Sequence, residues 1–496
     1  MRKAAREFIV FAVLLLWAFP PLLWAASVDG ALTEEQAARD SRILQRALKE
    51  LHPALTKYRT QAQIDAAFAR FDARGGAARE AREMYLAATE LAAYIQCGHT
   101  WTNTLNQQGP IKAALLDAPN KLPVRMTMVE GRWLVLASVD PALSAGDEIV
   151  SIDGHGTRDV VARMMPLLRA DGSSDGKRLR QLGHDRNDYS QMDILWPLLS
   201  PPVDAHYALE VRRGDGAARK LDVAAVSLSA RESALALKGF VLPSEEWRFR
   251  IEKDVGYLTL PTFSFHDSTF DWKGFIENSF ARLNAEKIRF LVIDIRDNEG
   301  GDGAIGGEIL SHLIDKPVDF VSDQSTSTYE RVPYVLARYL DTWDFSFFDR
   351  TGQVEKILEG TAVGKYRYLP NFRKAQTVTP AATPFKGRTF VLVGGENSSA
   401  GFQFAKLIQQ SGAATLVGQP TGGNLRGLNG GQLAWVNLPN SGVAVDIPLL
   451  AATFSVDTPD ASVTPEILVT PSFDARRAGR DVEMEAVLDR ITARND

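Results

Sequence analysis

The segment Thr389-Phe-Val-Leu-Val393, followed by Gly394-Gly-Glu-Asn-Ser-Ser-Ala-Gly401, decides the fold of this chain. Its apolar start predicts a buried strand, the two glycines predict a tight turn, and a helical pattern follows over 402–410. Such a turn exposes Ser399 in front of a helix N-terminus, which offers unpaired N–H groups and a positive dipole end. These are the mechanics of a nucleophile elbow, although its G-x-S-x-G spelling is absent because Asn397 stands two residues before Ser399. Helix capping by a serine is the competing interpretation.

Composition narrows the classes of function. The chain has 496 residues, of which 45% are hydrophobic and 24% are charged, so we expect a globular protein of two to four domains. The formal net charge is −5 and no basic run is present, which argues against a nucleic-acid partner. Cys97 is the single cysteine, so no internal disulfide is expected. The seven histidines have no metal-ligand spacing, and we expect neither a metal nor another cofactor.

The first 26 residues predict a secretory signal peptide. Three basic residues precede an apolar run over 8–24, and small residues follow at 25–27. Two prolines inside the run disfavour a regular membrane-spanning helix. We therefore expect a periplasmic or secreted protein, with membrane contact only if this segment is left uncleaved.

Two predicted domains precede the serine segment. Residues 27–118 show apolar positions at spacings of three and four, which predicts an N-terminal helical domain. Residues 119–230 change to short strands and turns. Within them, Ala145-Gly-Asp-Glu-Ile-Val-Ser-Ile-Asp-Gly154 resembles the central strand of PDZ domains, and 160–198 is interpreted as a helical insertion. An unrelated small β domain is the alternative.

The remaining sequence predicts an α/β domain. From 247 to 475, apolar strands alternate with helical segments, which is typical of a mostly parallel sheet covered on its faces. Residues 476–496 predict a C-terminal helix.

Three further sequence segments support Ser399 as a candidate nucleophile. They are Phe290-Leu-Val-Ile-Asp-Ile-Arg-Asp-Asn-Glu-Gly-Gly301, Gln419-Pro-Thr-Gly-Gly-Asn424 and Ser462-Val-Thr-Pro-Glu-Ile467. In this order, and together with the serine segment, they resemble the tail-specific (C-terminal processing) family of serine peptidases. The resemblance implies a mixed, mostly parallel α/β catalytic domain of the ClpP/crotonase-like kind, coupled to a PDZ or PDZ-like module.

The resemblance also implies roles for individual residues. Ser399 occupies the position of the nucleophile, directly before an alanine, and Ser398 would be a bystander or a hydrogen-bonding helper. The oxyanion hole would use the backbone N–H of Ala400 and one from Gly300 or Gly301. Physical chemistry agrees, because glycine lets a backbone N–H approach a reacting carbonyl closely.

The general base distinguishes two branches of the family. The bacterial processing enzymes use a lysine at the position where this chain has Asn424, and the nearby Arg426 guanidinium stays protonated and cannot act as a base. A second branch, similar to the catalytic core of tricorn protease, takes a histidine from the N-terminal helical region. His99 matches that position, and an imidazole suits the task. A helix-terminal histidine without chemistry is the alternative.

The third catalytic member stays open at this stage. The residue before the histidine is a serine in the tricorn arrangement and Gly98 here, so Thr100 is a candidate to orient His99. Asp457 and Asp460, just before the 462–467 string, are the candidate carboxylates.

Taken together, these features predict an exported serine endopeptidase that cleaves unfolded or extended polypeptides through an acyl-enzyme. The PDZ-like part would bind or gate an extended chain by strand addition. Two alternatives remain open: a catalytically inactive protein that binds peptides or apolar ligands on the same fold, and an esterase-like hydrolase.

Overall fold

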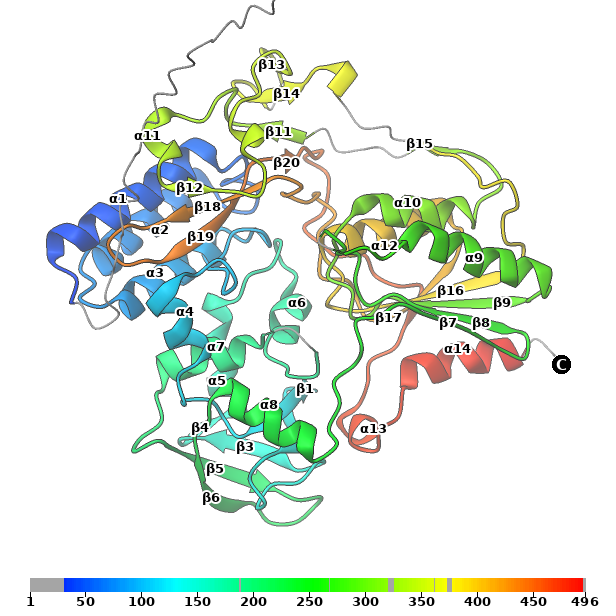
Figure 1. Cartoon of the computed structure of the whole chain (residues 1–496), viewed down its shortest axis with the longest axis horizontal. Helices are drawn as coiled ribbons and strands as arrows, with labels where there is room; N and C mark the ends of the chain where they lie inside the picture. Colours follow the sequence, from blue (N-terminus) through cyan, green and yellow to red (C-terminus); the bar gives the residue numbers. More distant parts are fainter. Residues whose placement is uncertain are drawn as a thin grey trace, which may run out of the picture.

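The computed structural model describes residues 31–186, 189–266, 268–319, 325–360, 362–372 and 377–493. The predicted signal peptide at 1–26 lies outside these residues. Three lobes surround the centre of the molecule (Figure 1). We call them the N-terminal lobe, the β lobe and the α/β lobe. Within the described ranges, no helix combines the length and apolarity needed to cross a membrane.

The α/β lobe is built on one mixed sheet. Its strands, in spatial order, are β21 (Ile467–Leu468), β17 (Thr415–Gly418), β16 (Arg388–Val393), β9 (Phe290–Asp294), β8 (Val255–Thr259) and β7 (Arg248–Glu252). All neighbours pair in parallel except β7 and β8, which are antiparallel. This confirms the predicted α/β class with a mostly parallel sheet. The antiparallel edge strand β7 was not predicted from the sequence.

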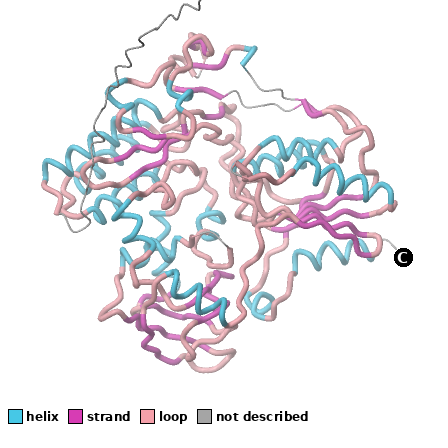
Figure 2. Tube along the Cα trace, in the orientation of Figure 1, coloured by secondary structure: helices cyan, strands magenta, loops and turns pink. Residues whose placement is uncertain are grey.

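Helices cover both faces of this sheet, as Figure 2 shows. One face packs against α9 (Trp272–Ala285), α10 (Gly303–Ser311) and α12 (Ser399–Ser411), and the other against α14 (Val482–Thr492). A short helix, α13 (Phe473–Arg477), precedes α14, and the paired strands β10 (Val318–Asp319) and β15 (Thr377–Val378) lie near α10. The central strands are buried on both sides, which explains their nearly continuous apolar sequence.

The β lobe is an antiparallel sheet with helices against it. The strands are β1 (Val124–Val129), β2 (Arg132–Ser138), β3 (Glu148–Ile152), β4 (His155–Gly156), β5 (His206–Arg212) and β6 (Arg219–Ala224). The helices are α5 (Thr157–Met164), α6 (Asp175–Arg180), α7 (Gln191–Leu199) and α8 (Leu228–Leu237). Helices therefore occupy much of the predicted insertion at 160–198. The assignment of this lobe as PDZ-like stays a prediction.

The N-terminal lobe begins with the predicted helices. They are α1 (Glu34–Leu51), α2 (Gln61–Gly75), α3 (Ala81–Tyr94) and α4 (Gly109–Leu116). A capping box between Thr33 and Gln36 starts α1. The apolar face of α1, with Leu44, Leu48 and Leu51, is fully buried.

Later parts of the chain return to this lobe. They contribute β11 (Ser325–Ser327), α11 (Tyr334–Ala337), β12 (Leu340–Asp341), β13 (Val354–Lys356), β14 (Tyr366–Tyr368), β18 (Leu433–Asn437), β19 (Ala444–Pro448) and β20 (Ala451–Ala452). Apolar residues of β18 and β19 share one core with the N-terminal helices. The range 247–475, predicted as an α/β domain, contains these returning segments, and its bounds as a domain stay a prediction. Alternating patterns indicate strands but do not tell which core they join.

A buried ion pair holds the β lobe together. Arg231 of α8 donates to both carboxylate oxygens of Asp193 on α7, at 2.8 and 2.6 Å. Both side chains are less than 5% exposed. Burial alone would raise the pKa of the Asp193 carboxyl, but the neighbouring Arg231 charge outweighs it and lowers that pKa.

We predict that Arg231→Met destabilises the protein by about 3–5 kcal/mol, because it removes the main positive charge beside the buried Asp193 carboxylate and leaves only His184 Nε2, at 3.1 Å, next to it. Urea denaturation of the purified protein measures this change. Arg46→Met is the matched control: the Arg46–Glu50 pair on α1 is exposed, and its loss should cost less than about 1 kcal/mol. Equal effects of the two substitutions would contradict the prediction.

Candidate active site

Ser399 lies at a strained turn between β16 and α12. The strand ends at Val393, and the helix begins at Ser399 itself, three residues earlier than the sequence pattern indicated. Ser399 has φ +45°, a left-handed conformation that is uncommon for a residue with a side chain. Such strain persists only where the surroundings enforce it, and it is typical of functional turns.

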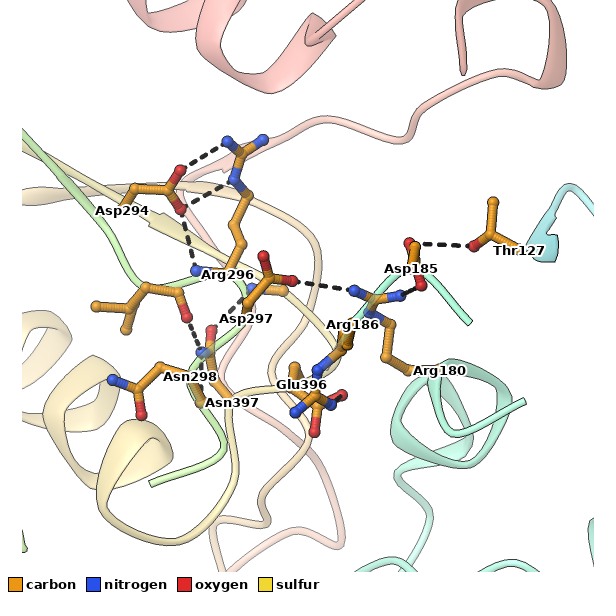
Figure 3. A network of polar contacts seen from close by, with 12 residues as sticks. Thr127, Arg180, Asp185, Arg186, Asp294, Arg296, Asp297, Asn298, Glu396 and Asn397 are labelled. Carbon is orange, nitrogen blue, oxygen red and sulfur yellow. Dashed lines mark hydrogen bonds and ion pairs between the residues drawn. The ribbon is translucent and has the colours of Figure 1, made fainter. Parts of the chain in front are cut away.

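The side chain of Asn397 enforces this turn. It is fully buried, and its Oδ1 accepts from the Gly394 N–H at 2.8 Å. Its Nδ2 donates to the carbonyls of Ile295 and Asn298, the latter at 3.0 Å (Figure 3). The Ser398 hydroxyl adds a bond to the Glu299 carbonyl at 3.2 Å. Asn397, which stands where the nucleophile-elbow motif has its first glycine, thus links the serine turn to the turn after β9.

The turn after β9 brings two glycines to the serine. Gly300 and Gly301 have φ +135° and +136°. A side chain on Gly300 would lie 2.8 Å from both the Ala400 nitrogen and Ser399 Cβ, and one on Gly301 would lie 2.2 Å from the Phe263 backbone. The Ala400 N–H belongs to the first turn of α12, where no intrahelical acceptor is available. Glycine is therefore required at both positions, and backbone amides crowd around Ser399.

One cavity of about 550 Å³ unites the residues singled out in the sequence. Ser399, His99, Gly300 and Gly301 all line it, although three hundred residues separate the histidine from the serine in the chain. Ala400 follows Ser399 directly, beside Gly300. The tertiary structure therefore brings a serine, an imidazole and glycine backbone amides to the same cavity.

The imidazole of His99 packs against Gly430, so closely that a side chain there would meet Cε1 and Nε2 at 3.2 Å. The Nδ1 atom is buried and has no hydrogen-bond partner among the described residues. Burial lowers the pKa of His99; Arg169 and Lys177 act in the same direction, and Asp171 and Glu299 oppose them.

The candidates for orienting His99 have other partners. Thr100 Oγ1 lies 2.9 Å from Nε2 of the buried His52. Asp457 is exposed, and Asp460 accepts from Asn424 Nδ2 at 2.6 Å and from the Ser173 N–H at 2.9 Å. None of the three lines the cavity. The structure therefore brings Ser399, His99 and the two glycines together, but not Thr100, Asp457 or Asp460.

A charged cluster from the predicted insertion forms another wall. Lys177 of α6 is 3% exposed; its ammonium lies 3.0 Å from Glu299 and pairs with the fully buried Glu396. Arg169 pairs with Glu299 at 2.8 Å, and Arg186 pairs with Glu396. Burial alone would raise the pKa of Glu299, but Lys177 and Arg169 outweigh it and hold that pKa well below its ordinary value.

The predicted insertion also contacts the turn after β9, through Arg180. Arg180 pairs with Asp185 and, at 3.0 Å, with Asp297 (Figure 3). Sequence analysis missed this cluster. The sequence did contain one indication of it, because charged residues are dense between Arg169 and Arg186.

Asp446 of β19 is a further carboxylate in the cavity wall. It accepts from the amides of Asn103 and Asn106 at 2.8 and 2.7 Å. Burial raises its pKa to about 6 despite these bonds. Among the described residues, no group of three or more potential ligands could hold a metal ion.

Residues 254–450 match the model of peptidase family S41. No curated protein matches the chain. The solved structure of mature CPAF complexed with lactacystin superposes with a TM-score of 0.62 at 15% identity, covering 93% of this chain and 99% of that chain.

Two further solved structures are similar at lower scores. The photosystem II D1 C-terminal processing protease has a TM-score of 0.41 at 15% identity and covers 89% of this chain and 94% of its own. Tricorn protease has a TM-score of 0.38 at 13% identity and covers 92% of this chain and 36% of its own. The likeness to CPAF shows the shared fold, and the family match over residues 254–450 shows the enzyme class. Residues 254–450 thus make the chain a serine peptidase with a segment similar to peptidase family S41.

Proposed function

We propose that the protein is an exported endopeptidase that cleaves unfolded or extended polypeptides, with Ser399 as nucleophile and His99 as general base. The observation that carries this proposal is the single cavity lined by Ser399, His99, Gly300 and Gly301. Export rests on the signal-like segment at 1–26 alone.

The proposed reaction follows the serine-peptidase sequence of steps. Ser399 Oγ attacks the scissile carbonyl while His99 takes its proton. The backbone N–H of Ala400 and that of Gly300 or Gly301 stabilise the oxyanion. His99 then gives the proton to the leaving amine, and a water hydrolyses the acyl-enzyme by the reverse roles.

The alternatives to a histidine base have poor geometry. Asn424, at the position of the family lysine, is an amide whose nitrogen donates to Asp460. Lys177 lines the same cavity, but its ammonium is engaged by Glu299 and Glu396. His99 is the imidazole that shares the cavity with Ser399, and a neutral imidazole suits proton transfer near neutral pH.

The shape of the site favours an extended peptide. Thr262 and Ser264 line the cavity on either side of Phe263, which forms a parallel bridge with Gly301. The cavity of about 550 Å³ is within the usual range of ligand sites. A segment of extended chain fits this arrangement better than a folded surface, and strand addition to the β lobe would help to hold it.

We predict that a fluorophosphonate forms one covalent adduct with the purified protein and none with Ser399→Ala, because only an activated hydroxyl attacks the probe. Intact-mass analysis measures this. His99→Ala should slow labelling at least a hundredfold, the lower range for a lost acid–base catalyst. CPAF is described in complex with lactacystin, so lactacystin is a second probe of Ser399. An adduct of equal yield on Ser399→Ala would refute the nucleophile.

We further predict that the acid limb of kcat/KM for a peptide substrate is centred below about pH 6.5, the ordinary pKa of histidine. A base must be neutral, so activity is lost as the pH falls through the pKa of His99, and burial lowers that pKa. A pH–rate profile checks this expectation. Burial also raises the pKa of Asp446 to about 6, so the Asp446→Asn variant is the control and should keep the same limb. A limb above pH 6.5, or one that moves in the control, would contradict the assignment.

A further inference from the structure

Gly98, the residue before His99, has no room for a side chain. A side chain on Gly98 would lie 2.8 Å from Asp171 Oδ2 and 3.2 Å from Asp171 Cγ. The Gly98 backbone is not in the left-handed region, so its conformation does not require glycine. The space beside residue 98 is therefore occupied by a carboxylate.

Asp171 also binds the backbone of the segment that leads into His99. Its Oδ1 accepts from the Gly98 N–H at 2.9 Å. On the other side of the same residue, Arg169 donates to the Gly98 carbonyl at 2.6 Å. A third bond, from the Gly172 N–H to the Gln96 carbonyl at 2.9 Å, pairs the two loops. The segment carrying His99 is thus fixed to the Arg169–Gly172 loop at three points.

The loop that carries Asp171 is itself anchored. Asp460 accepts from the Ser173 N–H at 2.9 Å, and the Ser173 hydroxyl donates to the Asp460 carbonyl at 2.9 Å. Asp460 is therefore a support for this loop rather than a partner of His99. Asp171 is 1% exposed and lines the cavity with His99 and Ser399.

We propose that Asp171 is the carboxylate that positions His99 and stabilises its protonated form during catalysis, in place of the predicted Asp457 or Asp460. The inference rests on the proposed roles of Ser399 and His99. When Ser399 Oγ forms its bond to the substrate carbonyl carbon, the proton of its hydroxyl moves to His99. The negative charge of Asp171 stabilises the imidazolium that forms.

The charges facing His99 make this role specific. Asp171 and Glu299 raise the pKa of His99, whereas Arg169 and Lys177 lower it together with burial. Glu299 is already paired with Arg169 at 2.8 Å and Lys177 at 3.0 Å. No ion pair of Asp171 is found among the residues that the structure describes. Its charge is therefore the less compensated of the two carboxylates.

Asp171→Asn is the sharpest test, because the amide oxygen still accepts from Gly98 while the charge is removed. We expect kcat/KM to fall about tenfold or more and its acid limb to move to lower pH, since the pKa of His99 loses a contribution that raises it. The Tm should stay near that of the parent. Asp457→Asn is the matched control at an exposed position and should match the parent in all three.

A second arm does not depend on activity. In the Ser399→Ala background, the imidazole of His99 is titrated by NMR with histidine-labelled protein, and His99→Gln identifies its resonance. Both Asp171→Asn and Gly98→Ala, whose added carbon displaces the carboxylate, should lower the pKa of His99. An unchanged titration in Asp171→Asn would overturn the proposal, even if the fluorophosphonate labels Ser399. Failure of labelling in the parent would instead refute the proposed function.

Discussion

The site depends on a buried crosslink between two turns that end neighbouring parallel strands. Asn397 accepts from Gly394 in its own turn and donates to the carbonyls of Ile295 and Asn298 in the other. Each such bond contributes about 0.5–1.5 kcal/mol, and an unsatisfied buried amide would cost more. Because parallel strands deliver their carboxyl ends to one edge, a single side chain can set the separation of the two turns. That separation fixes the distance between Ser399 and the amides of Gly300 and Gly301.

The predicted insertion at 160–198 forms part of the cavity wall. Lys177 contacts Glu299 in the glycine turn and Glu396 in the serine turn. Burying charges is expensive unless they are paired, so these groups are stable only when both turns and α6 are in place. The β lobe and the α/β lobe therefore assemble the site together.

His99 reaches Ser399 through the returning segments. Trp101, two residues after His99, bridges to Asp446 of β19, and Gly430 lies against the imidazole. Asn429 connects this loop to the N-terminal lobe, since it accepts from Lys57 at 3.0 Å and its amide lies 3.4 Å from Cys97 Sγ. Apolar residues between 434 and 449 belong to the same core as the N-terminal helices. His99 is thus positioned by segments that follow Ser399 in the sequence.

Local sequence patterns determined the elements of this protein. The apolar runs at β9 and β16, the helical periodicity of α1 and the glycines at 300 and 301 predicted strands, a helix and a close backbone approach, because these depend on residues near one another in the chain. The motif resemblance also singled out Ser399 and His99. Only the tertiary structure decided that Asp171 lies beside Gly98, that Asp460 supports a loop, and that β18 and β19 join the N-terminal core. These contacts join residues tens to hundreds of positions apart, and a sequence pattern specifies which face of an element is apolar but not which surface will cover it.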